Sequence, residues 1–151
     1  MYIPDFDYHT PATVDEACGI LASLVGLAGY LIPVDNTLLV EWASRQGFRQ
    51  EPLKRVSRFR IEQYLVGAVD SIDFEGDRVV DPALTVVELK KLPSGPGYIF
   101  FPTNQLKGYL LVLALEPKSM LGLATYKPFA HLLQPGEVFP VLRVIKKPKL
   151  R

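Results

Sequence analysis

Acidic side chains and a histidine near the start of the chain could bind a divalent metal. Asp5, Asp7 and His9 alternate with other residues, so an extended backbone would place their side chains on one side. The second histidine, His131, is far away in the sequence. We therefore interpret residues 5–9 as a surface edge rather than a metal centre.

A second acidic cluster surrounds Gly76 and suggests a calcium loop. The regular spacing of acidic residues before the glycine, and the distal Glu that completes such a loop, are both missing. The cluster is better explained as a solvated hairpin turn. Its acidic members are Asp70, Asp73, Glu75 and Asp77.

Two residues are candidate nucleophiles, but neither lies in an activating pattern. Cys18 falls on the apolar face of a predicted helix, where a thiol is core rather than reactive. Ser94 lies in the turn Pro93–Gly97, without a nucleophile elbow or a Ser-x-x-Lys motif. We therefore predict no catalytic set and no cofactor. Cys18 is also the only cysteine, which excludes an intrachain disulfide and fits the reducing cytoplasm.

Charge is segmented along the chain. The 17 Lys and Arg and 16 Asp and Glu leave a net charge of +1. Residues 1–44 nevertheless carry −6, residues 45–60 carry +5, residues 61–88 carry −6 and residues 89–151 carry +8. The near-neutral total excludes a uniformly basic nucleic-acid binder.

The two basic stretches, 45–60 and 143–151, form the predicted partner-binding surface. Opposite charges that meet across two proteins guide their encounter and register. The same charges could instead neutralise one another within one fold, and the sequence leaves both interpretations open. The side chains assigned to this surface are Arg45, Arg49, Lys54, Arg55, Arg58, Arg60, Lys146, Lys147, Lys149 and Arg151.

Capping signals predict two helices in the first third of the chain. Thr13 to Glu16 form a capping box, and apolar residues then recur at helical spacing as far as Gly26. Asn36 or Asp35 caps a second helix that runs through Gln46 and ends at Gly47.

Short strands are predicted over most of the remaining chain. Residues 56–69 fit both strand alternation and helical spacing, and residues 129–133 suggest a short helix. Gly108–Leu115 is a continuous apolar run of strand length, which favours a central strand. The other predicted strands cover residues 30–34, 71–74, 78–80, 84–92, 98–101 and 137–145.

These elements predict an α+β fold, with two N-terminal helices packed on a mainly antiparallel sheet. The length of 151 residues predicts a single domain over 1–151, with a possible subdivision near residue 52 into a helical part and a β-rich part. Residues 17–34 form an uncharged run, but its three glycines, Pro33 and phased apolar residues favour a buried helix and strand over a membrane span.

Residues 6–22 resemble the opening of the flavin-binding subunit of molybdenum hydroxylases. The matching positions are Phe6, Tyr8, Pro11, Glu16, Ala17, Leu21 and Ala22. The resemblance implies a flavin site, in which a glycine-rich loop follows the helix. Here Tyr30 replaces the second glycine of that loop, and a bulky side chain would oppose close approach of a pyrophosphate.

Residues 31–49 resemble the late strand, helix and strand of GNAT acetyltransferases. Asn36 before the helix and Gly47-Phe48 after it are the matching residues, and the resemblance implies acetyl-CoA binding. The acetyl-CoA loop of that family has no counterpart, and Asp15 and Glu16 would repel a pyrophosphate at the earlier helix. We interpret both matches as shared helix-capping patterns.

The leading prediction is a non-catalytic, soluble cytoplasmic protein that binds protein partners or itself, as a structural or assembly component of a larger complex. The alternative is a small enzyme or cofactor-binding protein related to the flavin or acetyltransferase families. Nucleic-acid binding is the third hypothesis, because only Phe59 could stack on a base within the basic stretches. A membrane role is not predicted.

Overall fold

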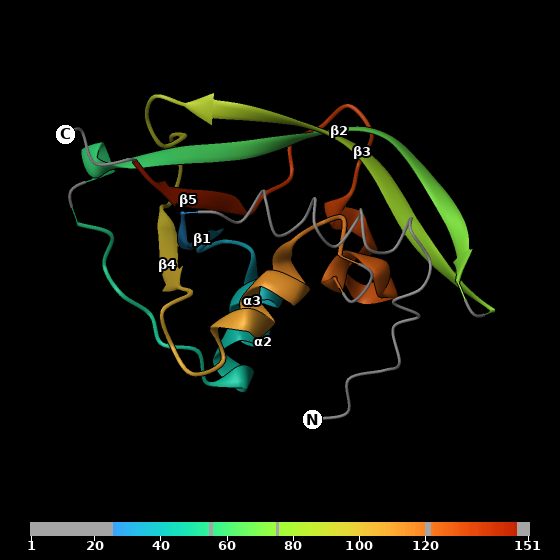
Figure 1. Ribbon diagram of the computed structural model, residues 1–151, viewed down its shortest axis with the longest axis horizontal. Helices are drawn as coiled ribbons and strands as arrows, with labels where there is room; N and C mark the ends of the chain where they lie inside the picture. Colours follow the sequence, from blue (N-terminus) through green and yellow to red (C-terminus); the bar gives the residue numbers. More distant parts are fainter. Residues whose placement is uncertain (1–25, 55, 75, 120–121, 148–151) are drawn as a thin grey trace.

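The computed structural model describes residues 26–54, 56–74, 76–119 and 122–147. Figure 1 shows the helices and strands that these residues form, coloured by their order along the chain. The five strands are β1 (Leu27–Pro33), β2 (Phe59–Phe74), β3 (Asp77–Leu89), β4 (Tyr98–Pro102) and β5 (Leu142–Lys146). The helices are α2 (Thr37–Gln46), α3 (Gly108–Leu115) and the 3₁₀ helices Val56–Arg58, Leu123–Thr125 and Lys127–Leu132.

The strands form one sheet in the order β3-β2-β5-β1-β4, and every pairing is antiparallel. The last strand, β5, therefore lies in the middle of the sheet. It pairs with β1 on one side and with the first residues of β2 on the other. Strands from both halves of the chain are joined through β5.

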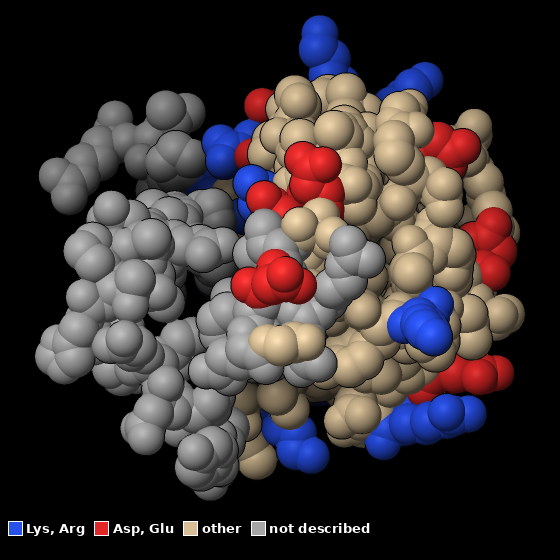
Figure 2. Space-filling model, turned by 90° about the vertical axis from the view of Figure 1, so that its right-hand side faces the viewer, with Lys and Arg blue, Asp and Glu red and all other residues tan. Residues whose placement is uncertain are grey.

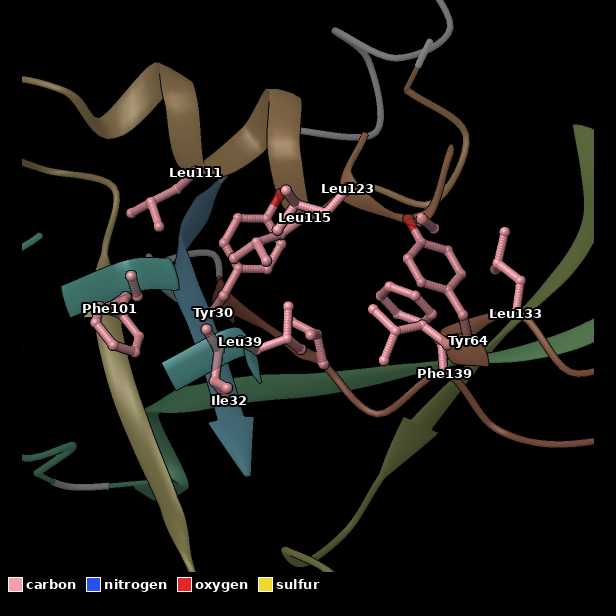
Figure 3. Close-up of a cluster of buried hydrophobic side chains, with 14 of the residues drawn as sticks. Tyr30, Ile32, Leu39, Tyr64, Phe101, Leu111, Leu115, Leu123, Leu133 and Phe139 are labelled. Carbon is pink, nitrogen blue, oxygen red and sulfur yellow. The ribbon is translucent and has the colours of Figure 1, made fainter. Parts of the chain in front are cut away.

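Side chains alternate between two apolar layers, one on each face of the sheet. Tyr30 and Ile32 of β1 face the larger layer, together with Phe101 of β4. Residues of α2, α3 and the last two 3₁₀ helices cover this face, as Figures 1 and 3 show. Leu31 of β1 points the other way, into a smaller layer with Phe100. The partly buried Leu53 and Val56 of the segment before β2 pack against that smaller layer.

The β2–β3 hairpin confirms the turn predicted around Gly76. Phe74 pairs with Asp77, and Gly76 has a positive φ of 86°. Of residues 56–69, which fitted a helix or a strand, Val56–Arg58 form a 3₁₀ helix and the remainder belongs to β2. The pairing shifts between Val66 and Val69, where β2 carries a bulge. Beyond this bulge, in the part of the chain that the structure describes, β2 pairs with β3 alone.

The predicted arrangement of two N-terminal helices on the sheet is wrong. Only one described α-helix precedes the second strand, namely α2, and the helix predicted after Thr13 lies outside the described residues. The second α-helix is α3, formed by the run that was predicted to be a central strand. The fold is a five-stranded antiparallel sheet, and short helices occur in the segments that connect its strands.

The run Gly108–Leu115 forms a helix because most of its residues are good helix formers and because only one face of it is buried against the rest of the protein. Leu and Ala are strong helix formers, and a short, wholly apolar run has no periodicity that separates helix from strand. Gly108, Leu111 and Leu115 are buried at helical spacing, while Tyr109 and Leu113 are half exposed. Burial thus follows one side of the helix.

The predicted boundaries of α2 are confirmed, and so is the reason for them. The side chain of Asn36 accepts a hydrogen bond from the amide of Leu39 at 3.3 Å. Gly47 ends the helix in the left-handed conformation, with φ of 74°. No helix among the described residues is long and apolar enough to cross a membrane.

Candidate functional site

The pairing of β2 with β5 brings the two basic stretches of the sequence together. Phe59 pairs with Lys146, and Arg60 pairs with Ile145. Just beyond the pairing, the Lys147 ammonium donates a hydrogen bond to the carbonyl of Ser57 at 2.8 Å. Residues that lie more than 80 positions apart in the sequence therefore share one end of the sheet.

A hollow of about 360 Å³ lies next to this junction, between the start of β2, β4 and the segment before β2. The amide of Glu51 donates to the carbonyl of Phe100 at 3.0 Å, which fixes that segment along the edge of β4. The lining is mostly apolar, with one acidic and one basic side chain. It consists of Glu51, Pro52, Leu53, Lys54, Phe59 and Phe100.

Lys146 lies on the same face of the sheet as the hollow. Directly opposite residues of paired strands point to the same side, so the Lys146 side chain lies beside that of Phe59. Lys54 and Lys146 are both exposed. Neither forms an ion pair with a carboxylate among the described residues. We call the hollow together with Lys54 and Lys146 the basic-rimmed hollow.

Three other members of the predicted surface are paired with carboxylates of their own chain. Their partners are Glu41 for Arg45 at 3.7 Å, Glu51 for Arg49 at 3.0 Å and Glu62 for Arg60 at 3.1 Å. Arg60 also faces away from the hollow, because it follows Phe59 directly along the strand. The Arg45–Glu41 and Arg60–Glu62 pairs join neighbouring blocks of opposite charge, whereas Arg49 and Glu51 belong to the same block.

The remaining predicted residues divide between exposed and undescribed positions. Arg58 is exposed in the 3₁₀ helix before β2, and Lys147 is exposed after β5. Arg55, Lys149 and Arg151 lie outside the described residues. Figure 2 views the protein from the side where the end of the β2–β3 hairpin lies, and acidic and basic side chains are interspersed there.

A buried polar cluster on the opposite face of the sheet was not predicted from the sequence. Arg143, in the middle strand β5, is 3% exposed, and Glu116, which follows α3, is 7% exposed. The Arg143 Nε lies 3.3 Å from Glu116 Oε1. Tyr30 donates its hydroxyl to Glu116 Oε1 at 2.7 Å, and Tyr64 donates to Glu116 Oε2 at 2.8 Å.

Further contacts extend this cluster along β2. The Arg143 Nη1 donates to the Tyr64 hydroxyl at 2.6 Å, and the guanidinium lies 5.4 Å from the centre of the Tyr64 ring. Glu62, which is paired with Arg143 across the strands, lies 3.7 Å from Nη1. Glu62 also pairs with the partly exposed Arg60. A chain of alternating charges thus runs from Glu116 outward to Arg60.

The electrostatics of the cluster favour neutral tyrosines and a charged arginine. Burial, reinforced by the Glu116 carboxylate, raises the pKa of Tyr30 and of Tyr64 well above the usual value of 10. Burial lowers the pKa of Arg143, but Glu116 and the other neighbours more than offset this effect and raise the pKa overall. The hydroxyls therefore act as hydrogen-bond donors to Glu116, and the cluster joins three strands to the end of α3.

One sequence signal could have revealed this cluster. Glu116 ends a run of seven apolar residues, and Arg143 interrupts the apolar stretch Phe139–Ile145. A charged residue within an apolar segment is rarely buried without a partner, so two such residues of opposite sign predict a buried ion pair. Arg143 was counted only as part of a basic block.

The residues that carried the two family resemblances have structural roles in the described part. Gly29 lies where an added Cβ would be 2.3 Å from the carbonyl oxygen of Phe101, so close approach to β4 requires a glycine. Tyr30 points into the buried cluster, and Phe48 packs on Trp42 with ring centres 5.5 Å apart. The positions matched in residues 6–22 lie outside the described residues.

The candidate metal ligands and nucleophiles that lie in the described residues are not brought together into a site. The described residues contain no group of three or more His, Cys, Asp or Glu that could hold a metal ion. Asp70 and Asp73 are exposed on the hairpin, and Ser94 is exposed in its turn. Asp5, Asp7, His9 and Cys18 lie outside the described part.

No family model, curated protein or solved structure matches this chain.

Proposed function

We propose that this protein is a non-catalytic binding protein of the cytoplasm that acts as a structural or assembly component of a larger complex. The basic-rimmed hollow is the surface through which it recognises a protein. The observation that carries this proposal is the position of Lys54 and Lys146 beside an apolar hollow at the junction of β2 and β5.

This arrangement has the features of a protein-binding hot spot. A protein interface usually depends on a few apolar or aromatic anchors that fill a pocket, surrounded by charges that direct association. The hollow is near the small end of the range for ligand pockets, about 300–1,000 Å³. Its size suits one or two anchoring side chains, and its two lysines favour carboxylates beside them.

A charge-reversal experiment tests this assignment. The variant K54E/K146E changes two exposed side chains at the hollow, and K107E/K118E makes the same charge change at exposed positions flanking α3, on the other side of the sheet. Wild-type and variant proteins are immobilised and exposed to lysate at low and high salt, and each is also examined by sedimentation velocity.

We expect partners, or self-association, to be lost in K54E/K146E, retained in K107E/K118E and weakened by salt. Equal association by both variants would place the binding surface elsewhere. A wild-type protein that is strictly monomeric and retains nothing from the lysate would overturn the proposed function.

A further inference from the structure

The sequence contains a segment whose chemistry complements the basic-rimmed hollow. Residues 5–8 read Asp-Phe-Asp-Tyr, so two aromatic side chains alternate with two carboxylates. No Lys or Arg occurs anywhere in residues 1–44. This segment offers aromatic anchors for an apolar hollow and carboxylates for two lysines.

We propose that the basic-rimmed hollow of one copy binds residues 5–8 of a second copy. This inference rests on the proposed function and names the partner. Phe6 or Tyr8 would fill the space between Leu53, Phe59 and Phe100, while Asp5 and Asp7 would lie near Lys54 and Lys146. The apolar contact supplies affinity, and the charges supply register and rate of encounter.

The chain enters the described part of the structure close to the hollow. The carbonyl of Gly26 accepts a hydrogen bond from the Lys146 amide at 2.8 Å, so residues 1–25 connect to the sheet beside a lysine of the rim. Residues 9–25 separate this point from the binding segment. They span about 30 Å if the helix predicted after Thr13 forms, and about 60 Å if fully extended.

Each copy would then carry both a hollow and the segment that fills one. Two copies can therefore exchange segments reciprocally in a closed dimer, or further copies can join head-to-tail in an open chain. This geometry makes a complementation test possible. F6A/Y8A removes the anchors and keeps the hollow, whereas K54E/K146E alters the hollow and keeps the segment. The two lysines changed in K54E/K146E are exposed.

Sedimentation velocity over a wide range of protein concentration measures the association. We expect the wild type and the control K107E/K118E to associate with increasing concentration, and each of the two site variants to remain monomeric. An equimolar mixture of F6A/Y8A and K54E/K146E should recover a dimer and nothing larger, because one intact hollow and one intact segment remain. A mixture that stays monomeric while the wild type associates would overturn the proposal.

A labelled peptide of residues 1–12 measures the same contact directly. Binding to F6A/Y8A should saturate, weaken with salt and be at least about tenfold weaker when K54E and K146E are added to that variant. A peptide with Asp5 and Asp7 replaced by Lys should not bind. Peptide that binds F6A/Y8A but not a monomeric wild type would mean that the segment occupies the hollow of its own chain, which overturns the second-copy proposal.

The failure of this inference is distinguishable from failure of the proposed function. If K54E/K146E abolishes capture of another protein while the wild type never self-associates and the peptide does not bind, the hollow is a binding surface with a different occupant. The proposed function then stands and the inference does not.

Discussion

Arg143 is held in the centre of the sheet by groups from β2 and from the end of α3, and its side chain is almost fully buried. Glu116 is its main counter-ion, and the two tyrosine hydroxyls satisfy the same carboxylate. Removal of one partner from a buried ion pair leaves the other charge desolvated and uncompensated. The stability of this protein is therefore sensitive to residues that play no direct part in the proposed binding surface.

Glu116→Ala tests this dependence. We expect the free energy of unfolding to fall by about 3–5 kcal/mol, because Arg143 then remains buried without its main counter-ion. Arg45→Ala is the control, since the Arg45–Glu41 pair is exposed, and its change should stay below about 1 kcal/mol. Urea denaturation of both variants measures the two effects. Similar losses in the two variants would contradict the role assigned to the cluster.

The same cluster predicts a loss of stability at high pH. The folded-state pKa values of Tyr30 and Tyr64 lie above the unfolded value of about 10. Their contribution to stability is therefore fully present below about pH 10 and is lost as the pH rises beyond it, because the unfolded chain releases these protons first.

The absorbance of tyrosinate measures this behaviour. The chain has seven tyrosines, and we expect those of the cluster to ionise only as the protein unfolds. The double variant Y30F/Y64F should lose this late step. A native protein in which every tyrosine ionises near pH 10, without change in its circular dichroism, would contradict the assignment.

At the scale of elements, local rules predicted what local contacts determine. The ends of α2 were predicted because Asn36 and Gly47 act on the backbone of the helix itself. The β2–β3 turn was predicted because a glycine with positive φ is needed between strands that follow each other. The identity of α3 depends instead on its burial in the larger apolar layer beside residues that are distant in the sequence, such as Tyr30 and Leu39, and its apolar run has no local pattern that reports them.

The candidate site was predicted only in part, for the same reason. The basic stretches are visible in the sequence, but their junction depends on the pairing of β5 with β2, and the hollow depends on the segment before β2 lying along β4. Arg60 and Lys146 are both basic and lie near this junction, yet they point to opposite faces. Alternation along a strand separates them only after the register is known.

Substitution of two glycines tests how closely β1 packs against β4 and how α2 ends. Gly29→Ala would place a Cβ 2.3 Å from the backbone oxygen of Phe101, so β1 and β4 would have to separate. We expect a loss of roughly 3 kcal/mol or more. Gly47→Ala has open space around it but keeps a φ of 74°, and should lose only about 1–2 kcal/mol. Thermal unfolding of both variants gives the comparison, and equal losses would contradict the close packing of β1 on β4.

At the scale of the whole molecule, the near-zero net charge conceals two uses of charge. Arg45, Arg49 and Arg60 pair with carboxylates in their own chain, so the charge of this part of the basic stretch is neutralised within the fold. Lys54 and Lys146 are exposed beside an apolar hollow, and we propose an intermolecular use for these. Segmented charge in a sequence therefore indicates where to look for contacts, while pairing in the fold decides which charges remain available to a partner.

The prediction of a single domain concerns the whole molecule and can be tested by unfolding. The sheet joins β1 to β2 only through β5, and the larger apolar layer contains residues from both sides of position 52. Separate unfolding of a helical part and a β-rich part would require β5 to leave one of its neighbours. We therefore expect a single cooperative transition.

Two probes report on the two halves separately. Trp42, the only tryptophan, lies in α2 and packs on Phe48, so its fluorescence follows the first half of the chain. Far-ultraviolet circular dichroism follows the backbone structure of the whole chain, including the sheet, whose two longest strands, β2 and β3, belong to the part after residue 52. The two urea transitions should coincide, as they do when no intermediate is populated. A fluorescence change that precedes the loss of sheet signal would show that the chain divides near residue 52, because the α2 side could then unfold while β2, β3 and β5 stay paired.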